Sequence, residues 1–518
     1  MKKKSFLFYY FLLPIANCLL LIANCAAQPK YEFRAVWIAS VDNIDWPPKG
    51  MMDLDSQKTE FIRQVELHKS NGMNAVIVQV RPAADAFYSS QYEPWSQWLT
   101  GTQGKPPNPY YDPLEFMINE THKRGMEFHA WCNPYRADFK IGASSIAPSH
   151  ITKVHPEWFL DYGDKKYFDP ASKQVQSFVV KVISDIVSRY DVDAIHMDDY
   201  FYPYRISGKE FPDDESYKKS GSSLSKDDWR RSNVDTVIRA LSIAIKKEKP
   251  FCRFGISPFS VWRNKDKDPR GSESQAGQTN YDDLYADILL WLKQGWIDYV
   301  APQLYLEIGH EKIDYVKMLD WWSKNSYGKH LYIGHGVYRA GNNPAWKNPN
   351  EIPNQIKLLR QYPNVHGSIY FSSKSFNKNP NGWNDSLRNN YYKTPALIPP
   401  MNWIDREKPW APITEKTIVN DSVLHVRGKV DPRNNVPIKY FVVYKIAASS
   451  DTVRFGTDNP EYIYRIIMAA DSFEFSDTLS SKQYSYRYLI TAVGRNNNES
   501  EVSEMAVLVQ PDGKWKFY

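Results

Sequence analysis

Short apolar segments alternate with amphipathic segments of helical period, and this alternation restricts the fold more than any other feature of the chain. It begins near Phe33 and continues to Phe371, and the apolar segments have the length of β-strands. Such alternation is typical of βα units around a parallel sheet. Eight units over about 360 residues predict an α/β fold, a (β/α)8 TIM barrel with long top loops. The predicted strands are residues 34–40, 75–80, 127–131, 194–197, 253–257, 299–303, 331–335 and 368–371.

An open, doubly wound parallel sheet is the alternative architecture. Nucleotide-binding sheets of that kind carry a glycine-rich turn after their first strand. Residues 40–47 follow the first predicted strand and contain no glycine. The barrel is therefore favoured, with amphipathic helices predicted at residues 58–70, 113–124 and 174–189 between its strands.

The spacing of apolar residues along the chain changes after residue 392. Residues 393–412 are rich in proline, which ends regular structure and predicts a semi-rigid linker after a barrel domain at residues 30–392. Apolar and polar residues then alternate as they do in β-strands, so residues 413–511 predict a small all-β, immunoglobulin-like sandwich. Residues 494–503 resemble the final hairpin of a fibronectin type III domain, a module that usually spaces, docks or binds.

The first residues have the pattern of an export signal. Lysines at positions 2 to 4 precede an apolar run from Phe6 to Ala23. The run ends in Ile-Ala-Asn-Cys, which resembles a bacterial lipobox and places Cys25 at the position that becomes lipidated. Residues 1–27 are therefore predicted to be a lipoprotein-type signal peptide.

Two other interpretations of this N-terminus stay open. Lipidation at Cys18 would cut the apolar run short, and an ordinary signal peptide would be cleaved after Ala27. The protein leaves the cytoplasm in each case, and a lipid would hold a folded enzyme at a membrane surface. We expect an exported lipoprotein on the periplasmic side of the outer membrane, in contact with the membrane only through its lipid anchor.

Composition favours a glycan over a nucleic acid as the partner. The net charge is +6, and the lysines and arginines are spread along the chain, so no nucleic acid is expected. Aromatic residues make up 15% of the chain, and aromatic faces suit sugar rings. Cys132 and Cys252 are the only cysteines after the predicted signal peptide, which excludes a cysteine metal framework and predicts buried free thiols.

Two adjacent carboxylates follow the fourth predicted strand. Asp198 and Asp199 come directly after residues 194–197, at the end of a barrel strand where catalytic residues lie. Burying such charges costs free energy unless a site uses them. Asp198 is predicted to meet the anomeric carbon of a sugar, whereas alternation along the strand would turn Asp199 toward the barrel wall.

Hydrolysis of a glycosidic bond by two carboxyl groups also needs a proton donor. Glu307 is the preferred candidate, because it follows the sixth strand between apolar Leu306 and Ile308, an environment that raises a carboxyl pKa. Glu93, in an aromatic loop, and Asp42 are the other candidates. The predicted catalytic residues are Asp198, Asp199, Glu307 and Glu93.

The motifs of several other enzyme classes are missing. The sequence has no Gly-x-Ser-x-Gly elbow, no His-Glu-x-x-His pair and no phosphate loop. A cation held by Asp198 and Asp199 is a weaker alternative, because no group of histidines accompanies them. His196, inside the fourth strand, is expected to pack in the barrel. We therefore predict no cofactor and no metal.

Amides, arginines and aromatic rings at the other strand ends and loops are expected to hold the sugar hydroxyls and ring faces. The predicted substrate-binding residues are Asp42, Trp46, Gln79, Arg81, Trp95, Asn133, Arg136, Tyr200, Gln303 and Tyr305.

Six separated motifs, spread over about residues 30–390, resemble the bacterial glycosyl-hydrolase-like 10 family. The resemblance implies a (β/α)8 barrel distantly similar to the α-amylase superfamily, often anchored as a lipoprotein. It also implies cleavage of peptidoglycan glycan strands that have lost their stem peptides. Within the family pattern, a Trp often follows the residue equivalent to Tyr305, where this chain has Leu306, so one stacking platform is missing. The motifs are residues 33–47, 80–88, 92–101, 133–136, 198–203 and 302–305.

The resemblance favours nine of the candidates above as site residues, namely Asp42, Arg81, Glu93, Asn133, Arg136, Asp198, Asp199, Gln303 and Tyr305. We predict an envelope O-glycosyl hydrolase that cleaves glycan strands, first of all peptidoglycan without stem peptides, by a two-carboxylate mechanism at the carboxyl face of the barrel. The alternatives are a hydrolase of another polysaccharide and a non-catalytic glycan-binding lipoprotein.

Overall fold

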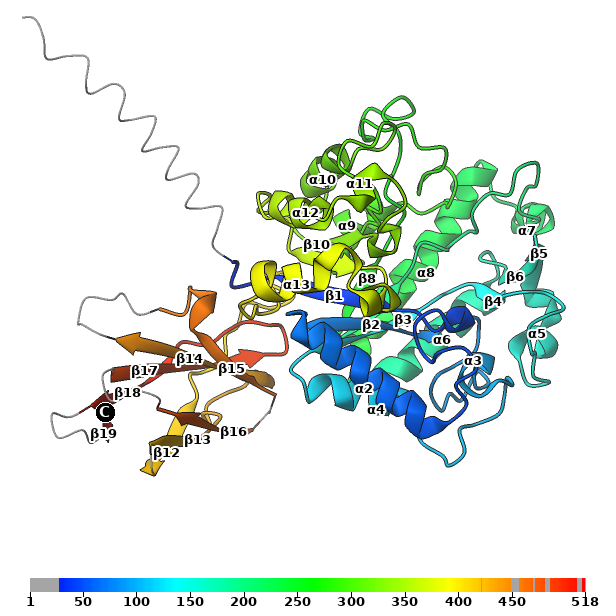
Figure 1. Cartoon of the computed structure of the whole chain (residues 1–518). Coiled ribbons are helices and arrows are strands. Elements are labelled where there is room, and N and C mark those ends of the chain that lie inside the picture. The colour runs from blue at the N-terminus through cyan, green and yellow to red at the C-terminus, as the bar shows by residue number, and fades with distance from the viewer. Residues whose placement is uncertain are drawn as a thin grey trace, which may run out of the picture.

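The computed structural model describes residues 28–420, 422–448, 456–468, 471–479, 485–509 and 515–517. The predicted signal peptide at residues 1–27, with Cys25, lies outside them. A closed barrel of eight parallel strands, surrounded by helices, forms the larger part of the molecule (Figure 1). The predicted barrel is confirmed.

The barrel strands follow one another in the order in which they occur along the chain, and the last strand pairs with the first. Each predicted strand is present, although the sixth is shorter than expected and ends at Val300. The barrel strands are β1 (Phe33–Ile38), β2 (Ala75–Arg81), β3 (Glu127–Cys132), β7 (Ala194–Met197), β8 (Arg253–Ile256), β9 (Tyr299–Val300), β10 (His330–His335) and β11 (Gly367–Tyr370).

The helices lie outside the strands, and most of the longer ones begin at a side chain that caps them. Ser172, for example, accepts a hydrogen bond from the backbone N–H of Val175 at the start of one helix, which satisfies a donor the helix itself leaves free. The main outer helices are α2 (Leu54–Ser70), α4 (Pro113–His122), α6 (Lys173–Arg189), α8 (Lys226–Glu248), α9 (Ile288–Lys293), α10 (Tyr315–Lys324) and α12 (Glu351–Leu359).

Shorter elements lie in the segments that follow the barrel strands. A three-stranded sheet follows β3, in the order β4-β6-β5. These elements are η1 (Val41–Asn43), α3 (Gln97–Thr100), β4 (Arg136–Asp138), α5 (Ile151–Val154), η2 (Pro156–Trp158), β5 (Phe159–Tyr162), β6 (Lys165–Phe168), α7 (Asp214–Ser220), η3 (Val337–Arg339), α11 (Pro344–Lys347), η4 (Ser373–Lys378), η5 (Pro380–Gly382), α13 (Trp383–Ser386) and η6 (Leu387–Tyr391).

The side chains of β1 point alternately into the barrel and toward the helices, and this alternation shows why such a sequence forms a barrel strand. Phe33, Ala35 and Trp37 pack with side chains of other strands, whereas Val36 and Ile38 belong to the larger cluster that includes the helices. All six residues of β1 are buried, since one face lines the interior and the other meets the helices. The interior is therefore filled with side chains, and a substrate must bind at an end of the barrel.

The chain ends in two antiparallel sheets that pack on each other around a core that includes Phe441, Phe473 and Tyr488. One sheet has the order β12-β13-β16 and the other β15-β14-β17-β18-β19. The assignment to the fibronectin type III type stays a prediction. The elements are β12 (Ile413–Asn420), β13 (Val423–Lys429), β14 (Ile438–Ala448), η7 (Pro460–Tyr462), β15 (Ile463–Ile467), β16 (Ser472–Thr478), β17 (Ser485–Gly494), β18 (Ser503–Val509) and β19 (Trp515–Phe517).

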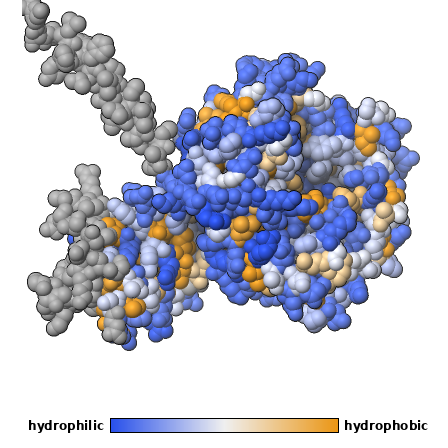
Figure 2. Space-filling model, in the orientation of Figure 1, coloured by the Kyte–Doolittle hydropathy of each residue, from blue (hydrophilic) through white to orange (hydrophobic). Residues whose placement is uncertain are grey.

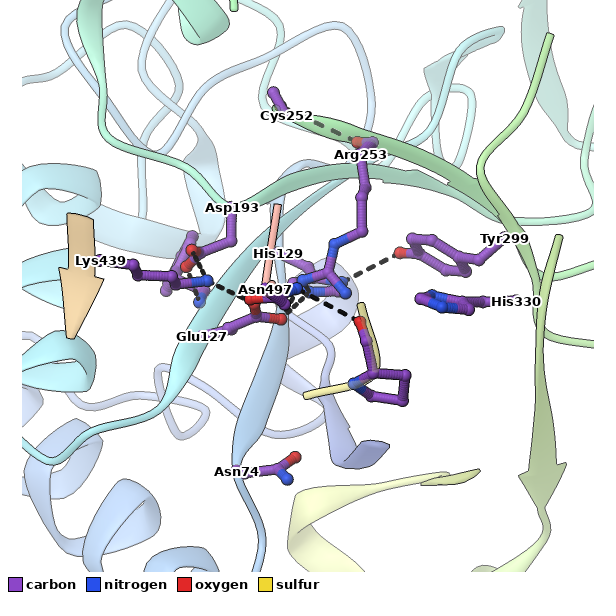
Figure 3. Close-up of polar contacts among 12 residues, drawn as sticks. Asn74, Glu127, His129, Asp193, Cys252, Arg253, Tyr299, His330, Lys439 and Asn497 are labelled. Carbon is purple, nitrogen blue, oxygen red and sulfur yellow. Dashed lines mark hydrogen bonds and ion pairs between the residues drawn. The ribbon is translucent and has the colours of Figure 1, made fainter. Parts of the chain in front are cut away.

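The C-terminal sheets contact the barrel at the amino ends of its strands. Lys439, on β14, pairs with Glu127 at the start of β3 and with Asp193 just before β7 (Figure 3). The proline-rich segment also packs on the barrel, since Leu397 is buried and Trp403 Nε1 donates to Asp298 Oδ1 at 3.0 Å. This contact leaves the carboxyl ends of the strands open at the opposite end.

Cys132 and Cys252 are free and buried, as predicted. Within the ranges given above, no helix has the length and apolar character that crossing a membrane requires. The face of the molecule in Figure 2 is largely hydrophilic, with hydrophobic side chains gathered in small patches.

Candidate active site

A cleft of about 530 Å³ opens at the carboxyl ends of the barrel strands. Aromatic rings form much of its wall, and the carboxylates that follow β7 lie in it. Tyr305 meets Trp37 edge to face, with ring centroids 6.4 Å apart, and lies 5.8 Å from Phe371. A concave surface with aromatic rings and few charged groups suits a sugar chain.

Asp198 is held in place by hydrogen-bond donors from the end of β3. Its oxygens accept from Trp131 Nε1 at 3.1 Å and from Asn133 Nδ2 at 3.0 and 3.1 Å, and the Tyr200 backbone N–H adds a longer bond of 3.4 Å. Burial raises the pKa of Asp198, while Arg136 and these hydrogen bonds oppose the rise. Asp198 is thus oriented by neighbours that favour its charged form.

Asp199 has a different environment, although it is the next residue. Burial raises its pKa to about 7, and the charge of Asp198 adds to the rise, while hydrogen bonds from Tyr204 and Gln303 reduce it. The Tyr204 hydroxyl donates to Asp199 Oδ2. Asp199 therefore keeps its proton up to near-neutral pH.

The prediction that Asp199 turns toward the barrel wall is wrong, because both aspartates line the cleft. Strand β7 ends at Met197, so the alternation of side chains between the two faces no longer applies at positions 198 and 199.

Glu93 lies behind the cleft rather than in it. Its carboxylate forms a buried ion pair with Arg81, in which Arg81 Nε donates at 2.9 and 3.1 Å. A further nitrogen of Arg81 donates to the backbone carbonyl of Asn133, the residue that binds Asp198. The pair therefore supports the segment that orients Asp198, and neither member is among the residues that line the cleft.

Glu307 also turns away from the cleft. Trp346 Nε1 donates to one of its oxygens at 2.9 Å and Asn343 Nδ2 to the other at 3.0 Å. The predicted rise of its pKa is wrong: partial burial raises the value, but the backbone, Trp346 and Asn343 hydrogen bonds outweigh it and the pKa is lowered. Leu306 and Ile308 flank Glu307 in the sequence, yet its side chain meets polar donors.

Five of the predicted substrate-binding residues line the cleft, namely Gln79, Arg136, Tyr200, Gln303 and Tyr305. Gln79 Oε1 accepts from the backbone at positions 40 and 41, whereas its buried Nε2 has no partner among the described residues. The guanidinium of Arg136 lies 5.7 Å from the ring of Tyr200, while its Nε donates to the Pro82 carbonyl at 3.0 Å. These groups present free donors and ring faces to a ligand.

The other predicted binding residues have different positions. Asn133 and Arg81 act behind the cleft, as described above. Trp46 is fully buried and donates to the backbone carbonyl of Gln57 at 2.8 Å. Trp95 packs edge to face on Tyr110, and Asp42 is exposed at the rim with a positive φ of 52°.

The sequence analysis did not single out Trp37, His310 and Arg339, all of which line the cleft. The alternation along the first strand could have indicated Trp37, since every second residue of it points inward. Arg339 lies on η3 after β10, and its buried Nε has no hydrogen-bond partner in the described part of the chain. No local pattern marks Arg339 or His310.

The sequence of residues 32–350 matches the family described as Glycosyl hydrolase-like 10. The chain belongs to this family. The protein named Glycosyl hydrolase YngK, from Bacillus subtilis strain 168, is 43% identical over 487 residues, which cover 92% of this chain and 94% of that protein. Glycosyl hydrolase DigH, from Escherichia coli strain K12, is 35% identical over 377 residues, with coverages of 68% and 85%. The family predicted from the six motifs is confirmed.

Among solved structures, that of Alpha-L-fucosidase isoenzyme 2 from Paenibacillus thiaminolyticus matches with a TM-score of 0.44 and 12% identity, over 70% of this chain and 49% of that one.

In this member of the glycosyl hydrolase-like 10 family, the neighbours of the two aspartates suit a sugar or an anionic group better than a cation. Trp131, Asn133 and Tyr204 all direct N–H or O–H donors at the carboxylates, and Arg136 adds a positive charge. A cation site requires oxygen or nitrogen lone pairs in those positions. No group of three or more His, Cys, Asp or Glu side chains in the described ranges is arranged to hold a metal ion.

Proposed function

We propose that the protein is a glycoside hydrolase that binds a glycan strand across the top of its barrel and cleaves it with Asp198 and Asp199. One observation carries this proposal: two adjacent carboxyl groups lie in one aromatic cleft with different partners around them. Three donors and Arg136 favour the charged form of Asp198, whereas the pKa of Asp199 is about 7. A pair of carboxyl groups with separated pKa values supplies an acid and an anion at the same pH.

Asp199 is the proton donor in this proposal. Its protonated carboxyl group would give a proton to the leaving glycosidic oxygen, and Asp198 would stabilise the positive charge that develops at the anomeric centre. Aromatic rings would hold the neighbouring sugars, and the free Nε2 donor of Gln79 would bind a hydroxyl or carbonyl oxygen.

The substrate we propose is peptidoglycan that has lost its stem peptides. Removal of the peptide leaves a lactyl carboxylate on every second sugar, so a stripped strand is an anionic polymer. Arg136 lines one side of the cleft after β3, and Arg339 lies diametrically opposite, after β10. Guanidinium groups bind carboxylates strongly, and a carboxylate converted to a peptide amide would lose that attraction.

The place of action we propose is the cell envelope. The basic residues, apolar run and lipobox-like end of residues 1–25 support export and lipidation at Cys25, on the periplasmic side of the outer membrane. A glycan strand of the cell wall is the polymer that an enzyme anchored there meets.

The direct test is mass spectrometry of the products after incubation of the mature protein with intact peptidoglycan and with amidase-stripped strands. Short glycan products from the stripped strands alone are expected, and the Asp198→Asn variant should form none. Glu307→Gln should keep most of the activity, because the Glu307 carboxylate lies outside the cleft. If Glu307→Gln lost activity while Asp198→Asn retained it, the catalytic carboxylate would instead be Glu307.

The same variants separate this proposal from a binding function. A non-catalytic glycan-binding lipoprotein would retain the strands without forming new reducing ends, and Asp198→Asn would bind as tightly as the wild type. The remaining alternative is hydrolysis of another polysaccharide, and it is tested by incubating the protein with a panel of other polysaccharides. Products from one of these, and none from stripped peptidoglycan, would contradict the proposed substrate while keeping the hydrolase.

A further inference from the structure

Both carboxylates of the cleft come from the end of a single strand. Asp198 and Asp199 directly follow β7, and no other carboxylate is among the described residues that line the cleft. Hydrolysis by two protein carboxyl groups needs them on either side of the scissile bond, so that one protonates the leaving oxygen while the other attacks, or activates water, at the opposite face of the sugar. The cleft provides carboxyl groups on one side alone.

The opposite wall of the cleft offers no replacement. Strands β10, β11 and β1 face β7 across the barrel. The side chains that these strands and the segments after them contribute to the cleft are aliphatic, aromatic or basic, namely Trp37, Ala39, Val41, Ile44, Tyr338, Arg339 and Phe371. Asp42, exposed at the rim after β1, is not among the residues that line the cleft. Glu307 and Glu93 are held elsewhere by Trp346 and Arg81. The far face of the anomeric carbon therefore meets no carboxylate among the described residues that line the cleft.

We propose that the attacking group is the substrate's own 2-acetamido group, so that the enzyme requires an N-acetylated sugar on the non-leaving side of the bond it cuts. This inference rests on the proposed glycosidase function. The acetamido oxygen forms a bond to the anomeric carbon as the glycosidic bond breaks, and the leaving oxygen takes the proton of Asp199. The product of this step is a cyclic oxazolinium ion and a free sugar hydroxyl.

Water completes the reaction. It adds to the anomeric carbon and returns a proton to Asp199, and the oxazolinium ring opens to restore the acetamido group. The net change is hydrolysis with retained configuration, and no other reactant is required. Exceptions of this kind to the two-carboxylate scheme are known among glycosidases.

Asp198 then has a role that fits its contacts. The acetamide N–H becomes more acidic as its oxygen attacks, and a carboxylate that accepts this N–H stabilises the positive ring. Trp131 Nε1 and Asn133 Nδ2 fix the Asp198 carboxylate in one orientation, as such a task demands. The packed rings of Trp37, Tyr305 and Phe371 supply an apolar wall for the acetyl methyl group.

The experiment compares stripped strands with their natural acetyl groups and strands whose acetyl groups are replaced by trifluoroacetyl. The substituents have similar size, but fluorine withdraws electron density from the attacking oxygen. We expect kcat to fall by about 100-fold or more on the fluorinated strands, while affinity for the inactive Asp199→Asn variant stays within a few-fold, as measured by calorimetry.

Proton NMR of the first-formed reducing end provides a second readout, and retained configuration is expected. Equal rates on the two substrates, or inverted configuration, would overturn the inference while leaving the glycosidase function intact. Absence of cleavage of the acetylated strands would overturn both. The two failures are therefore distinguishable.

Discussion

Strand β7 has a buried aspartate at each end, Asp193 before Ala194 and Asp198 after Met197, and the two meet opposite conditions. At the amino end, Lys439 Nζ lies 2.7 Å from Asp193 Oδ1, and His122 Nε2 lies 2.9 Å from Asp193 Oδ2. At the carboxyl end, donors and one arginine surround Asp198, and no lysine or arginine among the described residues pairs with Asp199. The aspartate at the amino end of the strand is therefore paired with cations, whereas the two aspartates at the carboxyl end line the cleft.

The pKa values record the difference. Burial acts to raise the pKa of Asp193, but Lys439 and His122 outweigh it and hold the value well below its usual range. Glu127 behaves in the same way, with its pKa lowered by Arg253 and Lys439 (Figure 3). Burial instead dominates for Asp199 and raises its pKa to about 7. Equal burial thus gives a structural ion network at one end and an acid at the other, and the partners decide which.

Among the variants that compare the two ends of β7, the largest effect is expected from Asp199→Asn, which removes the proposed proton donor. General acid catalysis is worth about 10²- to 10⁴-fold, so kcat on stripped strands should fall by that factor. Stability should stay equal or rise, because a buried carboxyl group is replaced by an amide. Measured kcat and thermal unfolding of both proteins check this. More than about a tenth of the wild-type activity would contradict the assignment.

Lys439→Met tests the amino end. It leaves Glu127 and Asp193 without one of their cations in a buried position, which should cost about 3 kcal/mol of unfolding free energy, measured by urea denaturation. The matched control is Arg495→Gln, which breaks a more exposed contact between the same two parts, with Asp191, and should cost less than about 1 kcal/mol. Similar losses of unfolding free energy in both variants would contradict a larger stabilising role for the buried Lys439.

The pH dependence of stability should differ in sign between the two ends. Asp199 holds a proton in the folded state up to about pH 7. Its contribution to the free energy of unfolding therefore falls as the pH rises from the pKa of the unfolded state, about 4, toward 7. Glu127 and Asp193 have lowered pKa values, so they contribute stability above their unfolded pKa and lose it as pH falls through the folded value.

Urea titrations of wild type and Asp199→Asn between pH 4 and pH 7 measure the first contribution. The advantage of the variant should grow with pH by about 3 kcal/mol. A difference that does not change with pH would mean that Asp199 is already ionised in the folded protein.

The smallest effect is expected from Arg339→Met, at the rim of the cleft. Loss of one guanidinium–carboxylate contact, worth about 1.4 kcal/mol, should lower kcat/KM on stripped strands about tenfold. Strands whose lactyl carboxylates have been converted to methyl amides serve as the control, and on these wild type and variant should be equal. An equal loss on both substrates would assign Arg339 a structural role.

Much of this architecture was predictable because it depends on local patterns. The apolar segments indicated all eight strands, and the position of Asp198 after the fourth strand placed it in the cleft. Gln79, Gln303 and Tyr305 followed from the same rule, since strand ends in a barrel meet at one rim.

The errors concern side chains whose partners are distant in the sequence. Glu307 lies between two apolar residues, but Trp346, on the short helix α11, turns its carboxylate away and lowers its pKa. Glu93 meets Arg81, and the pair acts behind the cleft. Neither contact could be read from neighbours in the chain, because side-chain direction and ionisation depend on what the fold brings within hydrogen-bond distance.

The sequence by itself determined the barrel, the strand ends and the types of residue available for chemistry. The reason is that the spacing of apolar residues along the chain, and the residues that end each strand or helix, are local properties. Only the tertiary structure decided which buried carboxylates are neutralised and which remain for catalysis. Asp193 and Asp198 are five positions apart on either side of one strand, yet Lys439 reaches the first from a separate sheet, while the second faces an open cleft. The physical reason is that the ionisation of a buried group depends on the charges and donors around it in space.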